Sequence, residues 1–96
     1  MGDASGPIEI MRTVRAANDR LLSLVSADED EEAALVPFLC ECADGQCSSR
    51  IPLVAAIYAE FRQRDVFLIV SGHRATTCAR VEHHRGFDAV AVNEAP

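Results

Sequence analysis

Three cysteines, Cys40, Cys42 and Cys47, lie within eight residues of one another. In an extended segment, residues i and i+2 point to the same side, so Cys40 and Cys42 would present both sulfurs to one point while Glu41 faces away. The pair Asp44-Gly45 predicts a turn that returns Cys47 towards that point. Three thiolates gathered in this way predict a metal site that lacks one of the four ligands of tetrahedral zinc.

Two residues could complete the site. His73 follows an apolar strand-like run and a glycine, where a side chain can project from the rim of a sheet. Cys78 lies in a segment that reads as a helix, where a free cysteine can pack as a small apolar side chain. We expect His73 to be the fourth ligand, because Cys3His is a common structural zinc set.

The same cysteines allow other chemistry. All four could hold an iron–sulfur cluster, or two could form a redox pair, or they could be buried without a metal. A polar turn between the cysteines makes joint burial without a metal hard to arrange. We therefore expect one structural zinc held by Cys40, Cys42, Cys47 and His73. The spacing resembles the zinc knuckle that follows SET methyltransferase domains, although no methyltransferase core is present in the chain.

Composition limits the possible functions. The chain has 96 residues and a formal net charge of −6, which argues against nucleic-acid binding by phosphate neutralisation. No run approaches the roughly 18 apolar residues of a membrane span, and the first residues lack the apolar core of a signal peptide. We therefore expect a cytoplasmic protein, in which four cysteines are better explained by metal or redox chemistry than by disulfides.

The N-terminal part divides into three segments. Residues 1–6 are expected to be disordered, residues 7–26 to form an amphipathic helix, and residues 27–34 to form an acidic linker. The helix could fold back on its own domain, which favours a monomer. It could instead pair with a second copy as a two-heptad coiled coil, with Asn18 setting the register of a homodimer through residues 8–26. We favour the fold-back arrangement.

Residues 35–93 are expected to form the zinc-binding domain. Their hydrophobic patterns predict strands, helices and extended segments in alternation. In order, these are a strand from 35 to 42, an extended segment at 50–53, a helix over 53–64 that buries Ile57, a central strand at 66–70, a helix over 75–85 closed by Gly86, and a strand at 87–92. The fold class is therefore α+β, with a small mixed or antiparallel sheet that carries helices mainly on one face.

A broader resemblance covers residues 38–92. The segments that carry it are Phe38-Leu39-Cys40-Glu41-Cys42, Cys47, residues 57–62, residues 67–70 and Gly72-His73. They resemble a group of small, functionally uncharacterised actinobacterial proteins with the pattern F-x-C-E-C-x4-C, a helix of the E-Y-x-x-V-R type and F-x-V-x-P-G-H. Ser71 stands where that group usually has proline. The resemblance implies the same four-ligand set and implies no activity.

No enzyme motif accompanies the ligands. The signatures of zinc deaminases, H-E-x-x-H proteases, phosphate-binding loops and G-x-S-x-G hydrolases are all absent. We therefore expect a non-enzymatic, zinc-stabilised binding or regulatory module whose partner is another protein. A thiol redox sensor that releases zinc on oxidation is one alternative. A small metal-dependent enzyme is the other.

Overall fold

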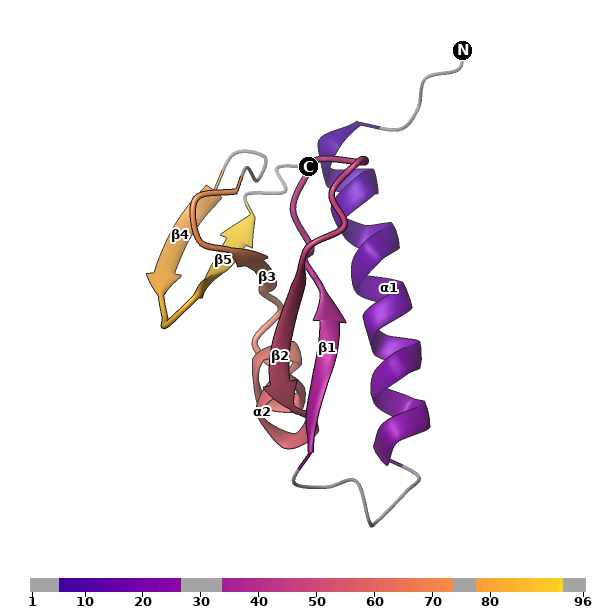
Figure 1. Cartoon of the computed structure of the whole chain (residues 1–96). Coiled ribbons are helices and arrows are strands. Elements are labelled where there is room, and N and C mark those ends of the chain that lie inside the picture. Colours follow the sequence, from indigo (N-terminus) through magenta and orange to yellow (C-terminus); the bar gives the residue numbers. More distant parts are fainter. Residues whose placement is uncertain (1–5, 27–33, 74–77, 93–96) are drawn as a thin grey trace.

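The computed structural model describes residues 6–26, 34–73 and 78–92 (Figure 1). In chain order the elements are α1 (Pro7–Ser26), β1 (Leu35–Leu39), β2 (Arg50–Val54), α2 (Ala55–Arg62), β3 (Phe67–Val70), β4 (Cys78–His83) and β5 (Phe87–Val92). The α+β class predicted from the sequence is confirmed. Residues 1–5 and 27–33, which cover most of the predicted disordered terminus and acidic linker, lie outside the described residues.

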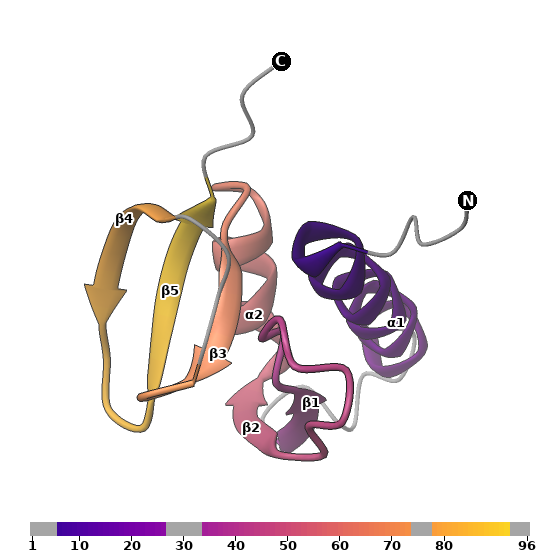
Figure 2. The ribbon, with the colours of Figure 1, turned by 90° about the horizontal axis from the view of Figure 1, so that it is seen from above.

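The strands form two small antiparallel sheets. β1 pairs with β2, with Val36 opposite Leu53 and Phe38 opposite Ile51. The second sheet has the order β3-β5-β4. In the view from above, α2 lies beside the second sheet, with α1 on its other side and β1–β2 below it (Figure 2). Neither described helix combines the length and the apolar character that a bilayer crossing requires.

Two apolar clusters fill the interior. The first brings together β1, β2, α2 and one face of the second sheet, and consists of Val36, Phe38, Ile51, Tyr58, Phe61, Val66, Leu68, Phe87 and Ala89. The second, which we call the knuckle cluster, consists of Met11, Cys40, Cys42, Phe67, Ile69 and Val90. β3 contributes alternate residues to the two clusters, so it is covered on both faces, as its apolar sequence predicts.

The prediction that β3 is the central strand is wrong, because β5 takes that place and β3 lies at the edge of its sheet. The outer edge of β3 is nevertheless not open. The backbone N–H of Glu41 donates to the carbonyl of Leu68 at 2.8 Å, so the segment that follows β1 runs along this edge. An apolar run indicates that both faces are buried but does not indicate which neighbour covers each edge.

The predicted helix over 75–85 is also wrong. Residues 74–77 lie outside the described residues, and Cys78–His83 form β4, which pairs with β5. Gly86 therefore lies in a hairpin turn instead of closing a helix, and its φ of 86° suits glycine in that position. Cross-strand pairing with an apolar neighbour overrides a weak local preference for helix.

A smaller difference concerns α2. Its buried residues are Ala55, Tyr58 and Phe61, whereas Ile57, predicted to be buried, is 43% exposed. The face that packs inwards is rotated because the helix begins at Ala55 and follows directly from β2.

α1 has the bounds that the sequence predicts, and it packs on its own domain. Met11 belongs to the knuckle cluster, whereas Leu21, Leu22 and Val25 pack against the first cluster. The guanidinium of Arg62 on α2 also donates two hydrogen bonds, of 2.6 and 2.9 Å, to the carboxylate of Asp19. Apolar contacts and a bidentate ion pair thus hold α1 in place.

Asn18 is the polar residue on this apolar face, and it is fully buried. Its amide nitrogen donates to the carbonyl of Leu39 at 2.9 Å and to Glu41 Oε2 at 2.7 Å. Its amide oxygen accepts the N–H of Leu39 at 2.8 Å. In this arrangement Asn18 fixes α1 to its own chain and is not free to meet a second copy.

We predict that Asn18→Leu destabilises the protein by about 3 kcal/mol, because buried groups of Leu39 and Glu41 lose their partner at about 1–3 kcal/mol each. Urea unfolding followed by circular dichroism measures the change. Ala17→Leu is the matched control, since it adds the same side chain at the neighbouring exposed position and is expected to change the unfolding free energy by less than about 0.5 kcal/mol. A stable Asn18→Leu protein of doubled mass would instead support the coiled-coil arrangement.

Candidate metal centre

Four side chains converge at one end of the molecule: those of Cys40, Cys42, Cys47 and His73. One ligand atom from each lies within 4.8 Å of all the others. Cys40 and Cys42 follow the end of β1, Cys47 follows a turn, and His73 follows β3. The structure therefore brings together the four residues that the sequence predicts as ligands, and they could hold a metal ion.

A short loop returns Cys47 to the other two cysteines. The carboxylate of Asp44 accepts the N–H of Gln46 at 2.9 Å, and the N–H of Cys47 donates to the carbonyl of Asp44 at 3.1 Å. At the base of the loop, the N–H of Cys40 donates to the carbonyl of Ser49 at 3.1 Å. The Asp-Gly pair thus forms the expected turn, with an aspartate side chain that bonds to the backbone two residues on.

His73 reaches the cysteines through a turn at the end of β3. Gly72 has a φ of 88°, a conformation that side-chain-bearing residues rarely adopt. The N–H of His73 then donates to the carbonyl of Val70 at 2.9 Å, which turns the chain back. His73 Nδ1 lies 3.4 Å from Cys40 Sγ and 3.6 Å from Cys47 Sγ.

These distances fit a tetrahedral zinc site. With Zn–S bonds of about 2.3 Å and Zn–N bonds of about 2.0 Å, a tetrahedron places sulfur about 3.5 Å from nitrogen and sulfurs about 3.8 Å apart. The separations of His73 Nδ1 from Cys40 Sγ and Cys47 Sγ, 3.4 and 3.6 Å, match the first value. All four ligand atoms lie within 4.8 Å of one another, a spread that small side-chain rotations can reduce to tetrahedral distances.

Burial disfavours the thiolate forms of Cys40 and Cys42 unless a cation is present. Desolvation raises the pKa of Cys40 to about 12, although the N–H of Val70, 3.2 Å from the sulfur, acts in the opposite direction. Desolvation also raises the pKa of Cys42. A coordinated metal cation favours the thiolate form outright. The donor set is thus chemically suited to zinc, and the Val70 N–H already points at one of its sulfurs.

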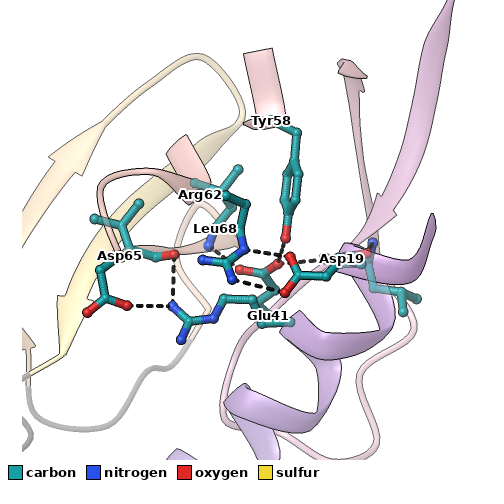
Figure 3. Close-up of polar contacts among 10 residues, drawn as sticks. Asp19, Glu41, Tyr58, Arg62, Asp65 and Leu68 are labelled. Atoms are coloured by element: carbon teal, nitrogen blue, oxygen red, sulfur yellow. Dashed lines mark hydrogen bonds and ion pairs between the residues drawn. The ribbon is translucent and has the colours of Figure 1, made fainter. Parts of the chain in front are cut away.

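The carboxylate of Glu41 is fully buried in the core, where it points towards Tyr58 (Figure 3). It accepts the hydroxyl of Tyr58 at 2.5 Å, the amide of Asn18 at 2.7 Å and the N–H of Leu68 at 2.8 Å. Desolvation raises the pKa of Glu41, and these three hydrogen bonds oppose the shift. The carboxylate of Glu41 is therefore hydrogen-bonded within the core.

Sequence reasoning missed these partners of Glu41. From the sequence, Asn18 is considered only for the register of a coiled coil, and Tyr58 is given no polar role. The position of Glu41 between two cysteines of an extended segment could have indicated such partners. A carboxylate that points into a core needs hydrogen-bond donors there.

The other cysteine and histidines are not part of this described set. The backbone of Cys78 is in β4, and its side chain lies outside the described residues. His83 and His84 are exposed. His83 Nδ1 lies 2.9 Å from Asp88 Oδ1, and the ring of His84 stacks on Phe87.

Comparison with known proteins adds no relative: no protein-family model, no curated protein and no solved structure matches the chain. The resemblance noted in the sequence therefore stays a prediction.

We predict that the purified protein contains about one zinc ion per chain and is colourless, because three sulfurs and one imidazole form a closed tetrahedral set for a metal with a filled d shell. Elemental analysis with an absorption spectrum measures both properties. Iron, with visible sulfur-to-iron absorption, would contradict the zinc assignment.

Loss of any ligand should remove the metal. Structural zinc supplies on the order of 10 kcal/mol of folding free energy in small domains, so Cys42→Ser and His73→Ala are expected to lose both the zinc and most of the cooperative unfolding transition. Cys78→Ser is the matched control and should retain both. A Cys78→Ser protein without zinc, beside a His73→Ala protein that keeps it, would make Cys78 the fourth ligand.

Proposed function

We propose that this chain is a zinc-stabilised binding or regulatory module that acts through contact with another protein. The observation that carries the proposal is the convergence of Cys40, Cys42, Cys47 and His73. Four protein ligands fill a tetrahedral zinc, which is typical of structural sites, whereas a catalytic zinc keeps a position for water or substrate.

The position of the site supports a structural role. Cys40 follows the last strand residue of the first sheet's β1, and His73 follows β3 of the second sheet, 33 residues later. A zinc ion at this point would link the two sheets. A cross-link between segments so far apart stabilises the fold by restricting the unfolded chain, in addition to the bonds that it forms.

The surroundings of the site do not favour catalysis. Metal-dependent hydrolysis needs a proton acceptor near the metal, and the adjacent carboxylate, that of Glu41, is already bound to Tyr58, Asn18 and Leu68. A metal-dependent enzyme remains the alternative with the least support from the geometry.

A surface for a partner is available at the end of the molecule away from the metal. Leu24, near the end of α1, is 72% exposed, and Leu35, at the start of β1, is 66% exposed. Leu35 pairs with Val54, which directly precedes α2 and its half-exposed Ile57. The end of α1, the start of β1 and α2 all lie at this end (Figure 1). Exposed apolar residues at one end of a molecule are candidates for contact with a partner.

One observation favours the redox-sensor alternative. The three sulfurs lie close enough together to form a disulfide after small movements, and Cys47 is only partly buried. A reducing cytoplasm, where we place the protein, would keep these thiolates available for zinc. Zinc release at low peroxide concentration, reversed by a thiol reductant, would favour this alternative.

We predict that Leu24→Ser combined with Leu35→Ser abolishes co-purification of the native partner while the zinc content stays at about one per chain, since both residues belong to element ends that lie away from the metal ligands (Figure 1). Quantitative mass spectrometry of the cross-linked, affinity-purified protein measures the partner. Ala16→Ser, on the exposed side of α1, is the matched control. A partner retained at full yield by the double variant would contradict this surface, and a zinc-free wild-type protein would contradict the proposed module itself.

A further inference from the structure

The first turns of α1 pack directly on the metal-binding loop. Met11 is fully buried in the knuckle cluster with Cys40 and Cys42, and Ile8 packs against the same cluster. A Cβ atom added at Gly45, in the turn of the loop, would lie 3.8 Å from Ile10 Cδ1. One side of the metal-binding loop is therefore covered by the first turns of α1.

Asn18 fastens the helix to the residues that flank Cys40. It forms both backbone hydrogen bonds of Leu39, which precedes Cys40, and one bond to Glu41, which follows it. The position of α1 and the backbone path on both sides of the first ligand are thus fixed by one side chain.

Glu41 fixes the same segment to β3 and α2. Its N–H donates to the carbonyl of Leu68, and its Oε1 accepts the N–H of Leu68. The backbone and the side chain of Glu41 are thus both hydrogen-bonded to one residue of the strand. Its Oε2 accepts the hydroxyl of Tyr58 on α2. The neighbouring ligand Cys40 accepts the N–H of Val70, two residues further along β3. With Glu41 held from three sides, the sulfurs before and after it have little freedom to turn away from each other.

We propose that Asn18, Glu41 and Tyr58 are positioning residues of the metal site, through which zinc binding and the docking of α1 strengthen each other. The proposal rests on the zinc-binding function above and adds its regulation. Coupling between two binding events is reciprocal, so a metal that holds the Cys40–Cys42 segment in place also holds the acceptors of Asn18 in place. Loss of zinc is then expected to loosen the contact between the loop and the first turns of α1, on the side that carries Met11, while Asp19 and the apolar residues near the end of the helix still hold the rest of it.

Cobalt(II) binding to the full chain tests the proposal, because the visible bands of tetrahedral cobalt report the arrangement of its ligands. The variants are Glu41→Gln, Asn18→Ala and Tyr58→Phe. Glu41→Gln keeps the shape of the side chain but replaces one carboxylate oxygen by an NH2 group. That group cannot accept the hydrogen bonds that Tyr58, Asn18 and Leu68 donate. Tyr58→Phe removes only the hydroxyl, so it remains informative where a larger change prevents folding.

Partners that orient metal ligands typically contribute 10- to 100-fold to metal affinity, so Glu41→Gln and Asn18→Ala are expected to weaken cobalt binding at least about tenfold. Tyr58→Phe is expected to act in the same direction by a smaller factor, and all three should shift the cobalt bands. Ile51→Val, a loss of one methylene from the first cluster, is the control for general destabilisation and should leave the bands unchanged.

Two other results have separate meanings. Wild-type bands in Tyr58→Phe and in every other folded variant, with no greater loss of affinity than in Ile51→Val, would overturn the positioning role. Failure of the wild-type chain to bind cobalt or zinc at all would instead overturn the metal site on which the proposal rests.

Discussion

The alternation of Cys40, Glu41 and Cys42 is the constraint on which the rest of the structure depends. Two sulfurs face a polar loop and His73, while the carboxylate between them enters the core. A buried carboxylate is costly unless it is fully hydrogen-bonded, and Glu41 meets three donors from three different elements. Its presence also raises the pKa of Tyr58, after the larger effect of burial. Because α1, α2 and β3 each supply one donor, the whole arrangement must form together.

This constraint explains why a small chain uses two sheets without a continuous ladder between them. β1–β2 and β3-β5-β4 meet where the segment after β1 passes along the edge of β3, through one backbone hydrogen bond and two side-chain acceptors, Glu41 Oε1 and Cys40 Sγ. The proposed metal lies at this junction. A domain whose core alone gives marginal stability gains from a cross-link between its two sheets.

Local patterns in the sequence predicted the parts that local physics determines. The bounds of α1 follow from Pro7 and an uninterrupted apolar stripe, and the four candidate ligands follow from their residue types and positions at element ends. β4 could not be predicted in this way, because half of its residues, Arg80, Glu82 and His83, are polar, and the segment becomes a strand through pairing with β5. The role of Asn18 was equally out of reach: an asparagine on an apolar stripe is compatible with a coiled-coil seam or with a buried intramolecular partner, and only the path of Leu39 and Glu41 beside α1 distinguishes them.

The central claim is that three sulfurs and one imidazole hold a structural zinc at the junction of the two sheets. X-ray absorption at the zinc edge of the purified full-length protein tests it most directly, because the distances and numbers of sulfur and nitrogen neighbours are measured at the metal itself. The account predicts three sulfurs at about 2.3 Å and one imidazole nitrogen at about 2.0 Å. Four sulfurs, or fewer than three sulfurs with oxygen neighbours from water, would contradict it.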